Sequence, residues 1–429
     1  MPRSRSRAVP QPEKHGQFQR FFSNLGPGLI TGAADDDPSG ISTYSVAGAT
    51  FGYLPLWTAL FSFPLMTAVQ LMCARLGLVT GLGLAGVIRT RYSRWVLWGA
   101  CALLVIANVI NIAADLGGMA EAATMVSGAP VALMVPIFGV MIVALLMWSS
   151  YRTIARVFKW LTLVLLAYVL TAFVARVDWR LALQATFIPH VEWSRAFFSV
   201  LVAILGTTIS PYLFFWQAAQ EVEEERKMGR NLARRRGATS EELDACRTDV
   251  TAGMFASNAV MYFIIMTTAA TLHAHGKTQT ATAQEAAEAL RPLAGAGAYW
   301  LFTLGLIGTG VLAVPVLAGS CAYAIAEASA WRGSLDRRPG RAKKFYLVLA
   351  TAIALGIGLN YAGLNAIRLL FTAAVINGVL APPLILIVLL LTRDRAVMGD
   401  AVNSRVVACL GWLAFAVMVV AALGLLVTT

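Results

Sequence analysis

Three consecutive carboxylates lie inside a long apolar stretch, in the segment 35–40, which reads Asp-Asp-Asp-Pro-Ser-Gly. A carboxylate at the centre of a bilayer costs on the order of 3 kcal/mol on insertion scales. The proline and the glycine interrupt a helix and leave backbone carbonyl groups without their usual partners. A chain keeps such a segment in a membrane where it lines a cavity, and these oxygen atoms suit a metal cation. The segment therefore predicts an intramembrane cation site.

The composition shows which elements must position these residues. Of 429 residues, 58% are hydrophobic and only 13% are charged, whereas a soluble domain carries about 25% charged residues. The apolar residues form runs of about 18 to 25, long enough to cross a ~30 Å hydrocarbon core. We therefore expect an all-α polytopic membrane protein with eleven spans. The expected spans are 26–50, 54–77, 95–126, 130–149, 154–175, 196–219, 250–272, 299–329, 344–359, 364–391 and 404–427.

The net charge of +12 is distributed as a membrane topology predicts. Most of the 34 Lys and Arg residues lie in the basic tail 1–24 and in alternate loops. By the positive-inside rule, this places the N-terminus in the cytoplasm and the C-terminus outside a plasma membrane. We expect a monomer in the lipid bilayer, with no nucleic-acid partner. We also expect no cofactor, because the cysteines lack metal-site spacing.

A second interruption lies in the sixth span, in the segment 207–212, which reads Thr-Thr-Ile-Ser-Pro-Tyr. The two broken spans are five spans apart, an odd number, so the two halves of the chain are expected to be inverted. Paired broken helices in an inverted repeat indicate a substrate site at the membrane midplane. We expect a first repeat over 25–176, a second over 196–391, and an additional span at 404–427.

The broken segments offer a set of oxygen ligands. Asp37, immediately before Pro38, is the expected anchor, and Thr207 and Ser210 would add carbonyl and hydroxyl oxygens. The alternative is that the sixth helix is only kinked by its proline, and that Thr and Ser satisfy the freed backbone. Asn377, beside an expected break in the tenth span, either completes the cation shell or hydrogen-bonds between helices. No His, Met or Cys lies in either broken segment, which favours Mg²⁺, Mn²⁺ or Ca²⁺ over late transition metals.

Four further acidic residues lie in the spans that surround this set. Asp35 and Asp36 are expected to attract cations or to position Asp37. Asp115 in the third span is either a proton acceptor or a structural counter-charge. Glu121 lies nearer the outer end of that span, where it can reach water.

The chain resembles the Nramp family of divalent metal transporters in several motifs. The sequence Gly-Pro-Gly-Leu at 26–29, followed by 37–40, resembles that family's first helix, whose signature is Asp-Pro-Gly-Asn. The segments 74–81 and 114–116 are similar to its second-helix end and its third-helix Ala-Thr-Asp-Leu, and 207–212 stands in the place of its sixth-helix Ala-Thr-x-Met-Pro-His. The resemblance implies a LeuT-like fold with an inverted 5+5 repeat, broken helices 1 and 6, an eleventh transmembrane helix and alternating access.

The departures from the family pattern fall on the site. Asp37 matches the family's metal-binding Asp, and Gly40 stands where the binding Asn would be. Ser210 replaces the Met whose thioether favours transition metals. Tyr212 replaces the His linked to proton movement, and a phenol with an ordinary pKa of about 10 stays neutral where an imidazole titrates. These substitutions are similar to those of the Nramp-related magnesium transporter branch.

The third span departs from the family in one further respect: Asp115 matches an acid of the proton route, but Gly118 replaces a neighbouring Glu. We therefore expect a secondary carrier that brings Mg²⁺ and Mn²⁺ into the cytoplasm with weak or absent proton coupling. The alternatives are a proton-coupled Mn²⁺/Fe²⁺ symporter of the ordinary Nramp kind and a sodium-coupled small-solute carrier of the same fold. An enzyme is not expected, because the spans contain no nucleophile elbow, phosphate loop or His/Glu metal motif.

Overall fold

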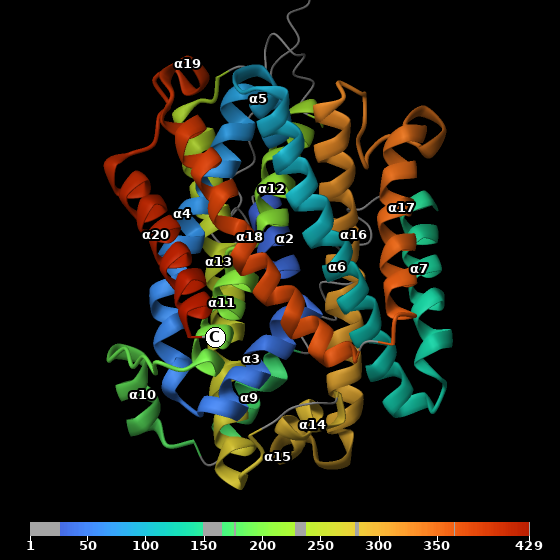
Figure 1. The fold of residues 1–429 in the computed structure, drawn as a ribbon, viewed down its shortest axis with the longest axis vertical. Helices are drawn as coiled ribbons and strands as arrows, with labels where there is room; N and C mark the ends of the chain where they lie inside the picture. Colours follow the sequence, from blue (N-terminus) through green and yellow to red (C-terminus); the bar gives the residue numbers. More distant parts are fainter. Residues whose placement is uncertain are drawn as a thin grey trace, which may run out of the picture.

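The computed structural model describes residues 26–148, 165–175, 177–227, 237–278, 283–363 and 365–428. Within these ranges the chain is helical and forms no strand. Nine helical segments of the described chain are long and apolar enough to cross a membrane, and they pack side by side in one bundle (Figure 1). The expectation of an all-α polytopic membrane protein is confirmed.

The first span is broken where the sequence predicts it. Helix α2 (Pro27–Asp35) ends before Asp36 and Asp37, and α3 (Pro38–Phe51) begins directly after them. Each half starts with a proline at its first position, where no backbone N–H is needed. Because the two halves have only 9 and 14 residues, neither could cross a bilayer alone.

The sixth span is broken in the same manner. Helix α11 (Arg195–Thr208) and α12 (Pro211–Lys227) are separated by Ile209 and Ser210. The two broken helices run in opposite directions through the bundle, with α2 beside α12 and α3 beside α11 (Figure 1). Opposite directions are what an inverted repeat requires.

A long helix, α13 (Ser240–Thr271), packs against both halves of the first broken helix. Its contact with α2 is built from glycines: a methyl group added at Gly32 would lie 2.3 Å from the carbonyl oxygen of Gly253. Small residues allow two helix backbones to approach this closely inside a membrane. The glycines therefore hold α2 at a fixed place on α13.

The remaining helices complete the bundle and its two ends. They are α4 (Trp57–Thr80), α5 (Leu84–Arg91), α6 (Arg94–Ser127), α7 (Val131–Trp148), α9 (Leu166–Val174), α10 (Trp179–Phe187), α14 (Ala283–Ala287), α15 (Arg291–Ala294), α16 (Ala298–Ala328), α17 (Lys343–Asn360), α18 (Ala366–Arg393), α19 (Arg395–Met398) and α20 (Arg405–Val427).

Three expected boundaries need correction. Helix α13 begins at Ser240 rather than near 250, because Thr239 and Glu242 form a capping box that starts the helix in its polar part. Helix α10 was not expected, since hydropathy does not detect a short amphipathic helix. Helix α18 continues through Pro382 and Pro383 without the expected break. Residues 1–24 and most of the first half of the fifth span lie outside the described residues.

The loops rich in Lys and Arg come together at one end of the bundle. Lys227 at the end of α12 pairs with Asp336, with 2.7 Å between Nζ and Oδ2. Arg75 of α4 donates to the carbonyl oxygen of Ala401, before α20, at 2.9 Å. At the same end Arg91 donates a hydrogen bond to Asp394, which lowers the pKa of that carboxyl below its usual value.

Candidate metal-cation site

The carboxylate of Asp37 caps the second half of the broken helix. Its Oδ1 accepts hydrogen bonds from the backbone amide of Gly40 and the hydroxyl of Ser39, each at 2.7 Å. Its Oδ2 accepts from Asn111 Nδ2 at 3.3 Å. One oxygen is thus held by the start of α3, while the other faces α6. Gly40 therefore contributes its backbone amide to Asp37 and has no side-chain oxygen to offer a metal.

Asp35 and Asp36 lie against α13 rather than beside Asp37. The hydroxyl of Ser257 reaches both: it lies 2.7 Å from Asp35 Oδ2 and 3.2 Å from Asp36 Oδ1. The other oxygen of Asp35 makes no hydrogen bond within the described chain. These two residues therefore form a pair of buried carboxylates at the helix break, on the side that faces α13.

At the break in the sixth helix, the polar side chains satisfy the freed backbone. Ser210 Oγ donates to the carbonyl oxygens of Gly206 at 2.8 Å and Thr207 at 2.5 Å. Thr207 Oγ1 bonds to the carbonyl oxygen of Ile204 at 2.9 Å. These hydrogen bonds are the ones expected if the proline only kinks the sixth helix and Thr and Ser satisfy the freed backbone. The hydroxyl oxygen of Ser210 still has lone pairs free to accept a water hydrogen or a cation, because it acts as a donor in these bonds.

Two tyrosines connect the two breaks. Thr207 Oγ1 lies 3.1 Å from the hydroxyl of Tyr44 in α3. The hydroxyl of Tyr212 donates to the carbonyl oxygen of Ala34, in the last turn of α2, at 3.0 Å. Tyr212 therefore satisfies one of the carbonyl groups that the first break leaves without a helical partner. The breaks in spans one and six therefore lie against each other.

Asp115 lies on α6 one helical turn after Asn111, on the same face. It faces the charge of Asp37 and the backbone amide of Ser39, but neither of its oxygens makes a hydrogen bond of normal geometry within the described chain. Gly118, one turn further, packs closely against Leu370 of α18: an added methyl group would lie 2.8 Å from Leu370 Cδ1. A larger side chain at this position would require Leu370 to move.

Asn377 lies on α18 next to the point where this helix crosses α11. A methyl group added at Gly206 would lie 2.1 Å from the carbonyl oxygen of Ala374 and 2.4 Å from the amide of Gly378. Asn377 is 1% exposed, and its side-chain nitrogen makes no hydrogen bond to any described residue. It is therefore a buried amide with unused hydrogen-bonding capacity beside the sixth helix.

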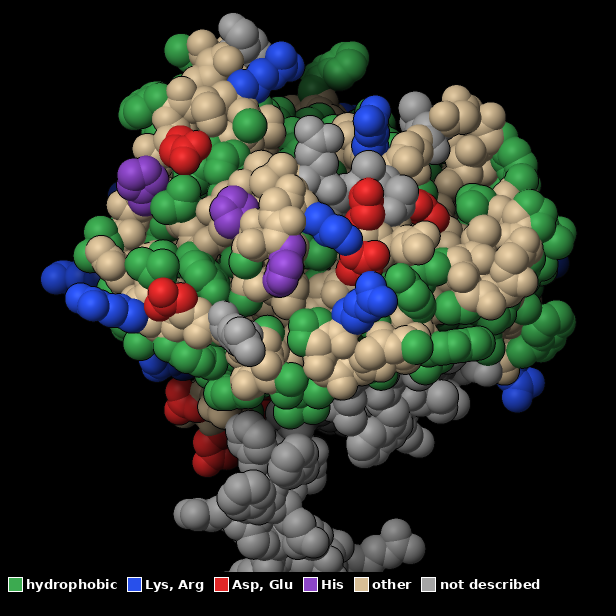
Figure 2. All heavy atoms as spheres, turned by 90° about the horizontal axis from the view of Figure 1, so that it is seen from below, with side chains coloured by type: hydrophobic (Ala, Val, Ile, Leu, Met, Phe, Trp, Pro, Cys, Tyr) green, Lys and Arg blue, Asp and Glu red, His purple; other side chains and the backbone are tan. Residues whose placement is uncertain are grey.

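Glu121 lies away from this centre. Its Oε1 accepts a hydrogen bond from the backbone amide of Ala283 at 3.2 Å, so it holds the start of α14. Histidines gather on the same end of the molecule (Figure 2). The Nδ1 atoms of His273 and His275 lie 2.9 and 2.6 Å from backbone carbonyl oxygens, which occupies one nitrogen of each ring.

Two residues that the motifs did not reveal belong to this centre. Asn111 and Ser257 are its hydrogen-bond donors from α6 and α13. Asn111 could have been found from its spacing of four residues before Asp115 on one helix. Ser257 carries no such signal, because only the packing of α13 on α2 brings it to the carboxylates.

The centre is rich in oxygen and closed to solvent. Asp35, Asp36, Asp37 and Asp115 are 0%, 5%, 2% and 0% exposed. Within the described part of the chain, no Lys or Arg forms an ion pair with any of them. The described part of the chain also contains no group of three or more His, Cys, Asp or Glu side chains placed to bind a metal. A cation here would therefore meet no more than two carboxylates, together with neutral carbonyl, hydroxyl or water oxygens.

Curated relatives resemble the chain over two thirds to nine tenths of its length. It is 28% identical over 406 residues to the divalent metal cation transporter MntH of Aeromonas hydrophila, covering 92% of this chain and 93% of the relative. It is 30% identical over 300 residues to the protein of that name from Xanthomonas campestris, covering 68% and 66%.

Solved structures show the same fold. A manganese transporter of Eremococcus coleocola, bound to an aromatic bis-isothiourea compound, superposes with a TM-score of 0.73 at 21% identity, over 98% of this chain and 88% of that chain. Mhp1, a nucleobase-cation-symport-1 family transporter, superposes with a TM-score of 0.59 at 14% identity, over 94% and 91%. These similarities confirm the LeuT-like fold.

The family model described as natural resistance-associated macrophage protein-like, Nramp, matches residues 28–428. The match includes both broken helices and the eleventh span. The chain belongs to the Nramp family.

Proposed function

We propose that this protein is a secondary transporter of divalent metal cations, with Asp37 as the central ligand. The observation that carries the proposal is a buried carboxylate at the break of the first helix, with no cationic partner among the described residues, in a chain of the Nramp family. An uncompensated buried carboxylate is costly, and a bound cation removes that cost. The curated relatives named divalent metal cation transporters support the substrate class.

The cation shell proposed here combines the two breaks. Asp37 supplies the charge, Thr207 a carbonyl oxygen, and Ser210 a hydroxyl oxygen or a water bound to it. Asn377 completes the shell when its amide turns toward the break. Gly40 takes part through its hydrogen bond to Asp37. We propose that the repeats 25–176 and 196–391 open this centre to one side of the membrane at a time, by alternating access.

We infer that the carrier accepts both Mg²⁺ and Mn²⁺. Oxygen ligands suit both ions, and the broken segments offer no sulfur or imidazole. Mg²⁺ retains several water molecules in most protein sites, so the shell must include water. This proposal is supported by Gly40, Ser210 and Tyr212, whose pattern resembles that of the Nramp-related magnesium transporter branch.

Direction and coupling follow from charge. We assign the end rich in Lys and Arg to the cytoplasm, so that the N-terminus lies inside and the C-terminus outside. We propose that metal enters the cell, because an inside-negative membrane potential favours the entry of cations. We propose weak or absent proton coupling, because Tyr212 uses its hydroxyl to bind the backbone of α2 where the family has a titratable His. The proton-coupled Mn²⁺/Fe²⁺ symporter is the second candidate, favoured by the position of Asp115 beside Asp37. The buried carboxylates and the family membership favour both of these metal carriers over a sodium-coupled small-solute carrier.

Metal uptake into proteoliposomes tests the central ligand. We expect Asp37→Asn and Asp37→Ala to reduce Mn²⁺ and Mg²⁺ uptake to the level of protein-free liposomes, because the remaining oxygens carry no charge. Asp394→Asn, which changes an exposed carboxylate at one end of the bundle, serves as the matched control and should retain uptake. Normal uptake by a well-folded Asp37→Ala protein would remove the proposal.

A further inference from the structure

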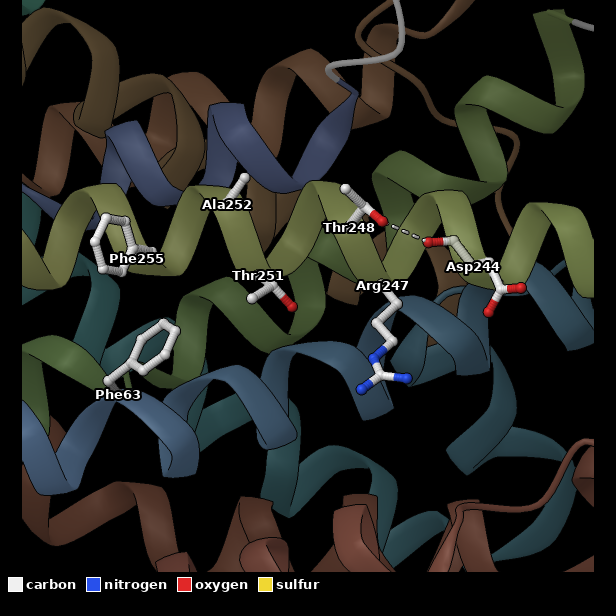
Figure 3. A pocket seen from close by; sticks show the side chains of 7 residues that line it. All are labelled: Phe63, Asp244, Arg247, Thr248, Thr251, Ala252 and Phe255. Carbon is white, nitrogen blue, oxygen red and sulfur yellow. Dashed lines mark hydrogen bonds between the residues drawn. The ribbon is translucent and has the colours of Figure 1, made fainter. Parts of the chain in front are cut away.

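A pocket of about 600 Å³ opens on the outer surface of α13, where this helix lies beside α4 (Figure 3). All but one of its lining residues belong to one face of α13, because they recur at spacings of three and four residues. The lining residues are Phe63, Asp244, Arg247, Thr248, Thr251, Ala252 and Phe255.

The polarity of this pocket changes along α13. At one end the rings of Phe63 and Phe255 meet edge to face, with centroids 5.8 Å apart, and Phe255 is 63% exposed. Toward the other end, Thr251 and Arg247 extend from α13 toward α4, and Asp244 follows (Figure 3). The order along the helix is therefore apolar, hydroxyl, positive and negative.

The two charges are available to a ligand. Arg247 and Asp244 are exposed, and neither forms an ion pair within the described ranges. The two side chains also form no ion pair with each other in the structure. Thr248 donates its hydroxyl to the backbone carbonyl of Asp244 at 3.0 Å and not to the Asp244 carboxylate.

The pocket straddles the boundary between the polar and apolar parts of α13. The helix begins at Ser240, but the apolar sequence begins near position 250. Phe255 lies about 12 Å further along the helix than Arg247, at 1.5 Å per residue. In a bilayer, Arg247 and Asp244 therefore lie at the level of the lipid headgroups, and Phe255 at the level of the acyl chains.

We propose that this pocket binds a phospholipid with an ethanolamine headgroup. The Arg247 guanidinium would bind the phosphate, for which its planar donor pair is suited. Asp244 lies about 4.5 Å further from the bilayer centre along the helix and would accept the primary ammonium. Phe63 and Phe255 would contact an acyl chain. A glycerol headgroup has no cation for Asp244, and a choline headgroup has no N–H to donate to it.

Native mass spectrometry of the full chain tests this assignment. The delipidated protein would be titrated with phosphatidylethanolamine, phosphatidylglycerol and phosphatidylcholine of identical acyl chains. We expect phosphatidylethanolamine to bind most tightly. Arg247→Gln should weaken all three lipids about fivefold, because each carries the phosphate, whereas Asp244→Asn should weaken only phosphatidylethanolamine by a similar factor.

Matched variants at the same end of the bundle are Arg405→Gln and Asp400→Asn, which should leave all three lipids unchanged. Phe255→Ala should weaken all three lipids, and a single gel-filtration peak checks the fold of each variant. Equal binding of the three lipids, or an Asp244→Asn protein that keeps the ethanolamine preference, would overturn the proposal. Displacement of the lipid by equimolar free phosphoethanolamine would also overturn it, since the site would then serve a soluble headgroup.

Discussion

At the scale of single residues, the broken segments have two chemical roles that compete for the same atoms. Ser210 donates to the carbonyl oxygens of Gly206 and Thr207 and thereby stabilises the broken end of α11. The carbonyl oxygen of Thr207 is also the oxygen we propose for the cation. The two roles are compatible if the metal meets Ser210 through a lone pair or through a water molecule.

Ser210 is expected to set the breadth of ion selection. Ser210→Met replaces a hard oxygen by a thioether, so Mn²⁺ and Cd²⁺ should gain over Mg²⁺. We expect the excess of Mg²⁺ needed to halve Mn²⁺ uptake to rise at least about tenfold, or ~1.4 kcal/mol. The measurement is Mn²⁺ uptake into proteoliposomes against increasing external Mg²⁺.

Ser210→Ala is the matched control, because it removes the same two hydrogen bonds without adding sulfur. Both variants lose about 1 kcal/mol per hydrogen bond to the backbone, so a selectivity change confined to Ser210→Met belongs to the thioether. If a large excess of Mg²⁺ does not reduce Mn²⁺ uptake by the wild-type protein, the prediction that it transports both ions is wrong.

At the scale of the elements, α13 holds the first broken helix in place. Asp249 of α13 accepts hydrogen bonds from the first backbone amides of α2: Oδ1 from Gly26 at 2.8 Å, and Oδ2 from Gly28 at 2.6 Å. The Leu29 amide also reaches Oδ1, at 3.3 Å. A carboxylate at a helix N-terminus satisfies its orphan donors and opposes its dipole. Here the capping residue comes from another helix, and so it docks α2 as well as capping it.

Asp249→Asn is expected to loosen α2 from α13. The new amide group would turn an N–H toward an N–H of α2, so at least one hydrogen bond to a charged acceptor is lost, at a cost of about 2 kcal/mol. We expect a lower midpoint of thermal unfolding in detergent and faster thiol labelling of a cysteine introduced at Ile30. Glu241→Gln, an exposed carboxylate in the first turn of α13, is the control. Labelling at the wild-type rate would show that the glycine contacts alone hold α2.

At the scale of the whole molecule, the distribution of buried charge decides what the carrier must move. Four carboxylates are buried near the two breaks, while Arg226 and Lys227 pair with carboxylates at one end of the bundle. No described basic side chain enters the centre to offset this charge. The described bundle therefore has a negatively charged centre and basic residues at one end.

Transport is expected to be electrogenic with little proton movement. If metal enters without protons, each charge gains about 2.3 kcal/mol per 100 mV of inside-negative potential. Mn²⁺ uptake into proteoliposomes should then rise with a valinomycin-imposed potential, while a pH-sensitive dye inside shows no metal-dependent acidification. Acidification that disappears in Asp115→Asn would contradict this prediction and favour the proton-coupled symporter.

The sequence by itself determined the membrane class, both helix breaks and the family. These features rest on local physical chemistry. Apolar runs have the length of a membrane span, prolines have no backbone N–H to donate, and carboxylates are costly inside a span. Each of them can be read from a window of about twenty residues. The expected boundary was wrong at the polar start of α13. Hydropathy does not detect this part of the helix, because its start is set by capping residues.

Only the tertiary structure decided which side chains meet. The three aspartates are adjacent in the sequence, yet Asp37 faces Asn111 of α6, whereas Asp35 and Asp36 face Ser257 of α13. The α2 cap at Asp249 lies more than two hundred positions away in the chain. Such partners depend on the rotation and close approach of helices, which glycine contacts such as Gly32 on Gly253 set. No local pattern contains that information, because packing is a property of two surfaces and each segment of sequence describes only one.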